Sequence, residues 1–404
     1  MRLTILLLFI ASFAHAQFNY GCNGERYITD VFEGIEKTTA VYGSNIDVFG
    51  DSIDLSMDIY SPTNDEADAR PVIIFAHGGS FISGNRSDME MFCEMFAAKG
   101  YVAATIDYRL LSIFQGIPDS ISALDITVKA SHDMRGAIRW FKASAIEGGN
   151  PYNIDPDMVF IGGYSAGAVT ALLAGTFDED EVELDFIQEL LDANGGFDGG
   201  TGNPDFLQYG DDVRGIVNYS GAIYDTAWID VNDPLVVSYH GNADETVPFG
   251  FDQVVVLGNP IVPLHGSGSI HEHLENNIEV PNFLYTVEGG GHTDIYFLPS
   301  FEQERLEAIA EMDTLLALII CATLVDVENT SFKELKAFPN PVTSQLFFEG
   351  ISDKSIVEVY SHTGQLILQE KYGNGLDVST LRAGMYIFTV EEKGDKFIGR
   401  FAKH

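Results

Sequence analysis

Basic residues are scarce in this chain of 404 residues, which has 22 Lys and Arg against 60 Asp and Glu and a formal net charge of −38. The shortage is uneven, because residues 333–404 carry nine of each sign while residues 3–332 carry 12 basic and 51 acidic residues. A surface with that charge repels the phosphates of nucleic acids and of anionic lipids. The composition therefore excludes nucleic acid as a partner and favours an exported protein.

Long apolar runs are also missing, since no stretch after the N-terminus approaches the roughly 20 apolar residues that cross a bilayer. At the N-terminus, Arg2 precedes the short apolar run 6–10, and Ala14-His15-Ala16 follows with small residues on either side of one position. This order is typical of a secretory signal peptide. We expect residues 1–16 to be removed before Gln17 and the mature chain to contain no membrane span.

Cysteine is limited to Cys22, Cys93 and Cys321, with no spacing that suggests a metal site. Export permits a disulfide, and an odd count leaves one thiol unpaired. We expect Cys22 to pair with Cys93, which would tie the mature N-terminus to the first helix. Pairing of Cys22 with Cys321 is the alternative.

Two other groups of residues could suggest a metal, and neither has the required spacing. The acidic run 178–181 lacks an EF-hand pattern, which favours a solvated loop over a calcium site. The sequence His271-Glu272-His273 matches no zinc motif. We therefore expect no metal and no organic cofactor.

Apolar runs bounded by turn residues alternate with longer amphipathic stretches over most of the chain. Continuous apolar runs are typical of strands buried on both faces, and their alternation with helices predicts an open, mainly parallel sheet with helices on both sides, an α/β fold. Expected strands are 71–76, 101–106, 158–161, 215–219, 235–239 and 283–287, with edge strands at 26–32 and 38–42 and a half-exposed strand at 55–60. Expected helices are 88–99, 126–145 and 301–320.

Three further segments complete the predicted organisation. The excursions 178–212 and 249–280 interrupt the alternation, and excursions of this length usually cover or shape a site; for the first, plain surface decoration is an equal alternative. After Val325 the composition changes to short alternating runs, which predict a small β-sandwich at 336–404. We therefore expect a catalytic domain at 17–325 and a linker at 326–335.

The pentapeptide Gly163-Tyr164-Ser165-Ala166-Gly167 follows an expected strand and precedes an expected helix at 168–174. Strand, G-x-S-x-G and helix together are typical of a nucleophile elbow. The glycines permit the tight turn, and the helix N-terminus favours an anion that develops beside the serine. The alternative is a glycine-rich turn with an ordinary serine.

A serine nucleophile needs a base, and the base needs an acid behind it. In this kind of fold the order along the chain is serine, acid, histidine. Asp244 lies in the loop after one expected core strand, and His292 follows the last core strand after three glycines. These two residues are the predicted acid and base for Ser165. Glu245, Asp225 and Asp233 are substitute acids; His265, His271 and His273 are expected at the surface or against substrate, and His240 is expected to be structural.

The loop His77-Gly78-Gly79-Ser80 follows the expected strand 71–76. Ester cleavage builds negative charge on the carbonyl oxygen, and backbone N–H groups must already point at it. Glycine lets the backbone face a substrate closely. We therefore predict an oxyanion hole made by the N–H groups of Gly78, Gly79 and Ala166.

These motifs resemble the α/β-hydrolase superfamily, and within it the carboxylesterase and hormone-sensitive-lipase-like groups, over about residues 26–322. The sequence departs from the lipase-like pattern at Ser80, where Gly or Ala is usual, and its His-Gly-x-x-Asp motif is closer to peptidases and general esterases. The matching segments are His77-Gly78-Gly79, Asp107-Tyr108-Arg109-Leu110, Gly163 to Gly167, His240-Gly241-x-x-Asp244 with Val247-Pro248, and Gly291-His292.

The resemblance implies a secreted serine esterase that forms an acyl-enzyme on a small ester or an esterified polymer. Acetylated or feruloylated polysaccharide, short lipid esters and synthetic polyesters are all open as substrates. A serine peptidase of the same fold is the nearest alternative. A catalytically silent binding protein displayed at the surface is another.

The C-terminal segment resembles the sorting domain of type IX secretion. Its marks are Phe338-Pro339-Asn340-Pro341-Val342, the pattern Asp377-Val378-Ser379-x-Leu381-x-x-Gly384-x-Tyr386, and the basic end Arg400-Phe401-Ala402-Lys403. The resemblance implies the type IX secretion machinery as a partner, with the chain secreted or held at the cell surface. A small carbohydrate-binding sandwich is the alternative.

Overall fold

The computed structural model describes residues 20–403 apart from several short segments. The expected signal peptide lies outside the described residues, as does most of the expected linker. The segments left out are 113, 115, 180–184, 200–201, 279–281, 323–332, 341, 349–350, 353–354, 362–365, 374, 382–383 and 393–394.

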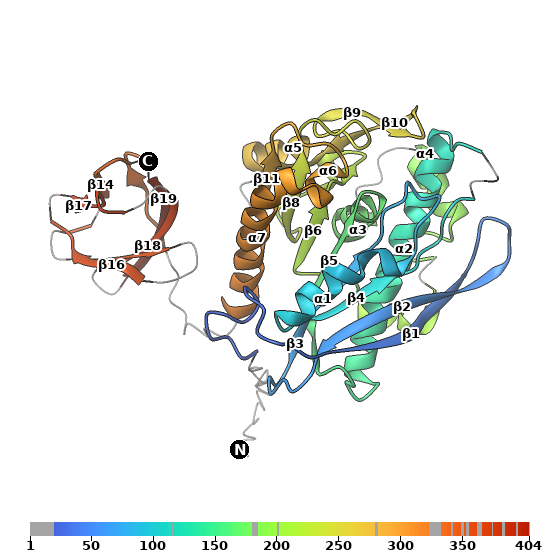
Figure 1. The fold of residues 1–404 in the computed structure, drawn as a ribbon, viewed down its shortest axis with the longest axis horizontal. Coiled ribbons are helices and arrows are strands. Elements are labelled where there is room, and N and C mark those ends of the chain that lie inside the picture. Colours follow the sequence, from blue (N-terminus) through green and yellow to red (C-terminus); the bar gives the residue numbers. More distant parts are fainter. Residues whose placement is uncertain are drawn as a thin grey trace, which may run out of the picture.

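An eight-stranded sheet organises residues 35–287, in the spatial order β1-β2-β4-β3-β5-β6-β8-β11. The pairs β1–β2 and β2–β4 are antiparallel and the other five pairs are parallel, so the predicted mainly parallel sheet is confirmed (Figure 1). The strands are β1 (Ile35–Ile46), β2 (Ser52–Pro62), β3 (Arg70–Ala76), β4 (Val102–Ile106), β5 (Ile154–Tyr164), β6 (Gly215–Tyr219), β8 (Leu235–Gly241) and β11 (Asn282–Val287).

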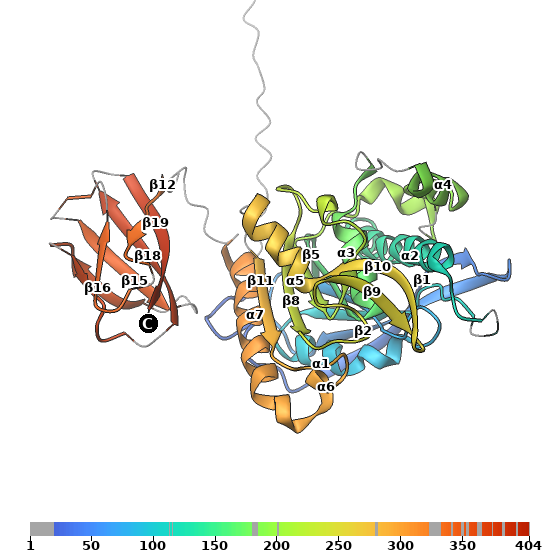
Figure 2. The same cartoon turned by 90° about the horizontal axis from the view of Figure 1, so that it is seen from above.

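Helices cover both faces of this sheet, which Figure 2 shows from above. Side chains alternate along a strand, so Val72 and Ile74 of β3 pack into the core under α2 and α3, while Ile73 and Phe75 pack into the core under α1 and α7. This double burial explains why the central strands read as continuous apolar runs. The helices are α1 (Glu90–Ala98), α2 (Ser120–Ile146), α3 (Ala166–Thr176) and α7 (Glu302–Ala322).

The N-terminal strap, residues 20–33, differs from the predicted edge strand at 26–32, which is wrong. The Asn23 side chain accepts hydrogen bonds from the N–H groups of Glu25 and Arg26 at 2.9 and 2.8 Å, which turns the chain back on itself. Tyr27 is then fully buried, and the Arg26 guanidinium pairs with both oxygens of Asp65. These contacts replace the hydrogen-bond ladder that a strand would need.

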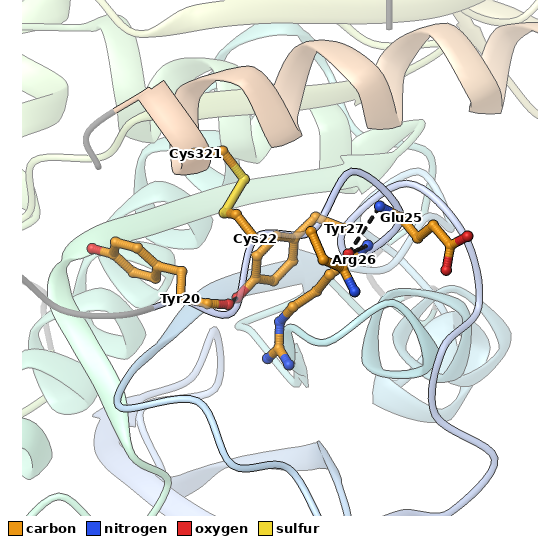
Figure 3. Close-up of a disulfide and its surroundings, with 7 residues drawn as sticks. Tyr20, Cys22, Glu25, Arg26, Tyr27 and Cys321 are labelled. Carbon is orange, nitrogen blue, oxygen red and sulfur yellow. Dashed lines mark hydrogen bonds between the residues drawn. A yellow bond between two sulfur atoms is a disulfide. The ribbon is translucent and has the colours of Figure 1, made fainter. Parts of the chain in front are cut away.

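The disulfide joins Cys22 to Cys321, with Cα atoms 6.0 Å apart, so the expected Cys22–Cys93 bond is wrong (Figure 3). Cys93 is a free thiol, fully buried on α1 in the core beneath the sheet. The strap instead passes the last turn of α7, which carries Cys321. The partner was therefore decided by the packing of α7 against the strap, which no local spacing reveals.

The two excursions carry secondary structure of their own. Residues 178–212 contain α4 (Asp185–Ala193) and a 3-10 turn at Pro204–Tyr209. Residues 249–280 form a hairpin that pairs with the short β7, followed by α5 and a single π turn. Their elements are β7 (Ala222–Ile223), β9 (Phe251–Val256), β10 (Asn259–Gly266), α5 (Ser267–His273) and the π turn Leu274–Ile278; the remaining short pieces are Arg86–Met89, Thr226–Trp228, α6 (Asp294–Phe297) and Pro299–Phe301.

Residues 333–403 form an all-β unit, as the sequence predicted. One sheet has the order β12-β19-β18-β15-β16 and a second the order β13-β14-β17. Phe348, Phe388 and Phe401 pack in the core of this unit. The strands are β12 (Lys333–Glu334), β13 (Ala337–Phe338), β14 (Gln345–Phe348), β15 (Ile356–Ser361), β16 (Leu366–Lys371), β17 (Leu376–Asp377), β18 (Gly384–Glu392) and β19 (Asp395–Lys403).

Helix lengths and hydropathies across the described residues give no helix that could cross a membrane.

Candidate active site

Ser165 occupies the turn between β5 and α3, with φ of 56° and ψ of −120°. A non-glycine residue rarely adopts this backbone conformation, and such strain clusters at functional sites. The flanking glycines are required by close packing, because a Cβ on Gly163 would lie 2.3 Å from the carbonyl carbon of Gly167, and a Cβ on Gly167 would lie 2.0 Å from the Ala76 oxygen. The turn therefore holds the serine where the ends of β3 and β5 meet α3.

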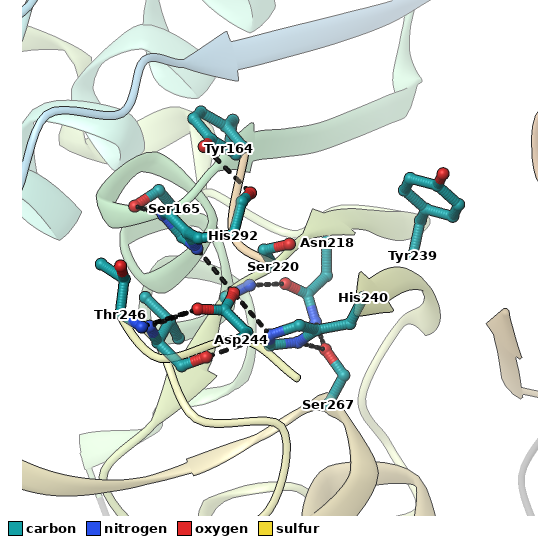
Figure 4. Close-up of polar contacts among 12 residues, drawn as sticks. Tyr164, Ser165, Asn218, Ser220, Tyr239, His240, Asp244, Thr246, Ser267 and His292 are labelled. Atoms are coloured by element: carbon teal, nitrogen blue, oxygen red, sulfur yellow. Dashed lines mark hydrogen bonds and ion pairs between the residues drawn. The ribbon is translucent and has the colours of Figure 1, made fainter. Parts of the chain in front are cut away.

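The structure brings Ser165, His292 and Asp244 into one hydrogen-bonded line (Figure 4). Ser165 Oγ lies 2.8 Å from His292 Nε2, and His292 Nδ1 lies 2.6 Å from Asp244 Oδ2. A carboxylate can only accept, so Nδ1 carries the proton and Nε2 is free to accept the serine proton. The ring is thus in the tautomer that a general base on Ser165 would need.

The Asp244 side chain has no solvent exposure, and four hydrogen-bond donors hold its carboxylate. Oδ1 accepts from the N–H groups of Thr246 and Val247 at 2.8 and 3.0 Å, and Oδ2 accepts from His292 and from His240. Burial favours the neutral carboxyl, but the hydrogen bonds from the two histidines outweigh it and lower the pKa of Asp244 to about 2. Asp244 is therefore an anion at neutral pH.

Tyr164 packs against one face of the His292 ring. Its hydroxyl donates to the His292 carbonyl at 3.2 Å, and the two rings are stacked with centroids 5.3 Å apart. Burial raises the pKa of Tyr164, so the hydroxyl keeps its proton for that bond. Since Tyr164 directly precedes Ser165, one stretch of backbone sets the position of both the serine and the histidine loop.

The loop after β3 is folded by three successive residues with positive φ, Gly79 at 121°, Ser80 at 55° and Phe81 at 59°. The carbonyl of Gly79 accepts from the N–H groups of Ile82 and Ser83, at 3.0 and 3.1 Å, which closes the loop. A Cβ on Gly78 would lie 2.8 Å from the Tyr164 ring. The loop therefore packs directly against the residue that precedes Ser165.

The three predicted oxyanion donors lie around this loop. Ala166 is the first residue of α3, where a backbone N–H has no acceptor within its own helix. Gly78 and Gly79 line one cavity together with Tyr164, whereas Ser80 and Ala166 line a second cavity with Ser165. Tyr108 anchors the base of the loop, because its hydroxyl donates to the His77 carbonyl at 2.6 Å.

The cavity that contains Ser165 is almost entirely apolar. Four of its 27 lining residues are polar, and none of the residues described there is charged. Both excursions contribute walls, α4 with Ile187 and Leu190, and the β9–β10 hairpin with residues such as Val254 and Val262. Residues of both excursions thus line the space beside Ser165.

One of the three histidines of the second excursion, His271, differs from expectation. His271 was expected at the surface or against substrate, yet it is 2% exposed and bonded to Ser238 and Asn282. His265 stacks on Phe251, and His273 Nε2 lies 3.1 Å from the Ile229 carbonyl. The substitute acid Asp225 accepts from the Ala227 N–H and caps a turn.

Sequence reasoning missed the second partner of Asp244. His240 was expected to be structural, and the structure places its Nε2 3.2 Å from Asp244 Oδ2. The signal was the spacing in His240-Gly241-x-x-Asp244, since a tight loop returns the fourth residue to the first. Ser267, which bonds the other side of His240, lies in the second excursion and gave no signal. Among the described residues no cluster of three or more His, Cys, Asp or Glu is arranged to hold a metal ion.

Comparison with known families gives two matches. Residues 57–223 match the family model described as BD-FAE, and residues 336–403 match the secretion system C-terminal sorting domain. The first match contains the loop after β3 and the turn at Ser165 but ends before Asp244 and His292.

Curated relatives match shorter stretches. Carboxylesterase 3B of Mus musculus is 35% identical over 120 residues, which are 28% of this chain and 19% of the relative. Gut esterase 1 of Caenorhabditis elegans is 30% identical over 121 residues, which are 29% of this chain and 20% of the relative. The chain thus spans about a fifth of the length of the curated relatives it matches.

Solved structures align over a longer range. Esterase 2 of Thermogutta terrifontis in its apo form is 21% identical, with a TM-score of 0.48, and covers 70% of this chain and 94% of its own. Its propionate-bound form is 20% identical, with the same TM-score, and covers 71% of this chain and 95% of its own.

Proposed function

We propose that this chain, an α/β-hydrolase that carries a type IX secretion sorting domain, hydrolyses carboxylic esters with Ser165 as nucleophile, His292 as base and Asp244 as acid. The observation that carries the proposal is the hydrogen-bonded line from Ser165 Oγ through His292 to Asp244 Oδ2. The esterase relatives support the same reaction class.

In the first half of the reaction, Ser165 Oγ attacks the ester carbonyl carbon while His292 Nε2 takes the hydroxyl proton. The anionic Asp244 stabilises the imidazolium that forms. Negative charge develops on the carbonyl oxygen, and the N–H groups of Gly78, Gly79 and Ala166 are the proposed donors to it. The tetrahedral intermediate then expels the alkoxide, which leaves as an alcohol after receiving the proton from His292.

In the second half, a water molecule attacks the acyl-enzyme. His292 removes one proton from the water, and the second tetrahedral intermediate collapses to release the carboxylic acid and return the proton to Ser165 Oγ. Each step uses only side chains and backbone N–H groups of this chain, water and substrate. The steps balance without a metal or organic cofactor.

The apolar cavity at Ser165 is the proposed site for the acyl group. Burial of an alkyl or aryl group in an uncharged cavity is favourable by about 0.8 kcal/mol for each methylene. The C-terminal sorting domain marks the chain for export by type IX secretion to the cell surface or the extracellular space. Its substrate is therefore proposed to be an ester met outside the cell.

The proposal is tested with Ser165→Ala on p-nitrophenyl esters from acetate to octanoate. We expect kcat/KM to fall by about 10⁴-fold or more, because the covalent step is lost. Ser87→Ala is the control, because Ser87 is exposed and its hydroxyl donates to the Asn85 side chain at 2.6 Å, and it should retain activity.

Fluorophosphonate labelling gives a second measure of the same proposal. Folded wild type should take up the label and Ser165→Ala should not. Undiminished ester hydrolysis by Ser165→Ala, or labelling at another residue, would refute the assignment. Faster cleavage of aminoacyl amides than of matched esters would favour a serine peptidase instead.

A further inference from the structure

His240 lies directly behind Asp244 at the end of β8, and its side chain is fully buried (Figure 4). Nε2 lies 3.2 Å from Asp244 Oδ2 and 3.2 Å from the Val247 carbonyl, and Nδ1 lies 2.8 Å from Ser267 Oγ. Both neighbours of Nε2 can only accept. Nε2 therefore carries the ring proton and donates toward the carboxylate.

The protonation of His240 Nε2 fixes which atom donates and which accepts in the neighbouring hydrogen bonds. With Nε2 protonated, His240 Nδ1 accepts from the Ser267 hydroxyl, and Ser267 Oγ accepts from Asn218 Nδ2 at 3.1 Å. The orientation of the Asn218 amide is set because its Oδ1 accepts from the Gly221 N–H at 2.8 Å. Each donor in this series of hydrogen bonds thus meets an acceptor.

Beyond Asn218 the network continues to His271. Asn218 Nδ2 also donates to Ser238 Oγ at 2.9 Å, and Ser238 Oγ lies 2.8 Å from His271 Nε2. Asn282 Oδ1 accepts from His271 Nδ1 at 2.7 Å, so Ser238 donates to Nε2. Burial lowers the pKa of His271 to about 4, which keeps this end of the network uncharged.

We propose that His240 is a positioning residue for the reaction, a second histidine that donates to the same carboxylate oxygen of Asp244 that His292 uses. The inference rests on the proposed function and deepens it. Among the residues that the structure describes, backbone N–H groups hold Oδ1 of Asp244, whereas only the two histidine rings hold Oδ2. His240 is thus the sole contact, among the residues described, that orients Oδ2 independently of the base.

Two consequences follow for His292. The carboxylate is aimed at Nδ1 even while the base changes its protonation state, because His240 and the backbone hold three of its four contacts. The negative charge on Oδ2 is also shared between two donors, so it stabilises the His292 imidazolium less than an unshared oxygen would. His240 therefore aligns the acid and weakens its stabilisation of the charged base.

Few other groups are placed to change the charge or the orientation of the Asp244 carboxylate. The titratable groups that face the Asp244 carboxylate, among the described residues, are His240, His292 and Tyr164. Glu245 is adjacent in sequence but exposed. The ring of His240 meets Phe249 edge-on, with centroids 5.6 Å apart, so that side adds no charge.

The test compares His240→Leu with His240→Gln, whose amide N–H can replace Nε2–H. For His240→Leu we expect kcat to fall about tenfold with KM unchanged, as loss of a charge-assisted hydrogen bond would produce. We expect the acid-side midpoint of the kcat/KM profile to rise by about half a pH unit or more. His240→Gln should return both values most of the way to wild type.

Ser238→Ala is the matched control, because Ser238 is equally buried and lies in the same network without contacting Asp244. It should lower thermal stability and leave the pH profile in place. If His240→Leu fails to fold, Ser267→Ala leaves His240 present but removes its hydroxyl donor, and it should shift the profile in the same direction by less.

Proton NMR separates this inference from the proposed function. The low-field resonance of His292 Nδ1–H should move in His240→Leu and return in His240→Gln, whether or not the chain cleaves esters. An unchanged resonance together with an unchanged pH profile would overturn the role of His240. A moved resonance in a wild type without esterase activity would refute only the proposed reaction.

Discussion

The two sides of Ser165 are built in opposite ways. On one side a polar network runs from His292 through Asp244 and His240 to His271, with each side chain held by specific hydrogen bonds. On the other side lies the cavity whose 27 lining residues include four polar ones and, among those described, no charge. The polar side depends on the directions of its hydrogen bonds, whereas the apolar side depends on the shape of the cavity and on its apolar area.

This difference decides how each side responds to substitution. A buried hydrogen bond that loses its partner leaves a desolvated group behind, so a single change in the polar network has a large effect. Dispersion and apolar burial are spread over many contacts, so a single change in the cavity has a graded effect. We expect the polar side to control rate and the apolar side to control which ester is preferred.

The largest expected effect is on the polar side. Asp244→Asn keeps the shape of the side chain but removes the charge and offers an N–H to His292, which favours the wrong tautomer. We expect kcat to fall about 10⁴-fold on every ester of a chain-length series. Asp225→Asn is the control, because Asp225 caps a turn by accepting from the Ala227 N–H at 2.9 Å. Equal losses in the two variants would contradict the assignment of Asp244.

An intermediate effect is expected on the apolar side. Leu190 of α4 lines the cavity, whereas its neighbour Leu191 packs in the main core instead. Leu190→Ala should raise the kcat/KM ratio of longer to shorter acyl esters about tenfold, since a few methylenes of space are worth about 1–3 kcal/mol. Leu191→Ala should destabilise the fold and leave the ratio unchanged. A common shift in both variants would remove α4 from the acyl site.

The smallest expected effect links the polar side to stability. The pKa of Asp244 is about 2 in the folded protein, below its ordinary value of 3.8, so folding favours its charged form. Its contribution, about 2 kcal/mol, is present above pH ~4 and is lost as the pH falls toward 2. The difference in unfolding free energy between wild type and Asp244→Asn, measured by urea titration, should therefore shrink over that range. A constant difference would contradict the hydrogen-bonded carboxylate.

The motifs around Ser165 were readable in the sequence because each is local. Gly163 and Gly167 are needed within one turn, and the loops of Asp244 and His292 each follow a buried strand. Parallel strands end at one edge of a sheet, so residues that follow β3, β5, β8 and β11 must converge there. The mainly parallel sheet and the all-β C-terminal unit could also be predicted, because the periodicity of apolar residues is likewise a local property of the sequence.

The residues that line the cavity could not be predicted from the sequence. Leu190 and Val262 belong to excursions of uncertain pattern, and nothing near either residue in the chain indicates that it lines the space beside Ser165. His271 illustrates the same point, since a histidine in a polar loop gives no sign that Ser238 and Asn282 will enclose it.

The sequence by itself determined that the Ser165 turn, the Asp244 loop and the His292 loop each follow a strand, in that order along the chain. These features could be predicted because short-range sterics and hydropathy act within a few residues. Only the tertiary structure decided that Cys22 pairs with Cys321, that the excursions enclose the apolar cavity, and that His240 shares the Asp244 carboxylate. Each of these depends on contacts or bond directions that are set when distant segments pack, and packing is a property of the whole fold.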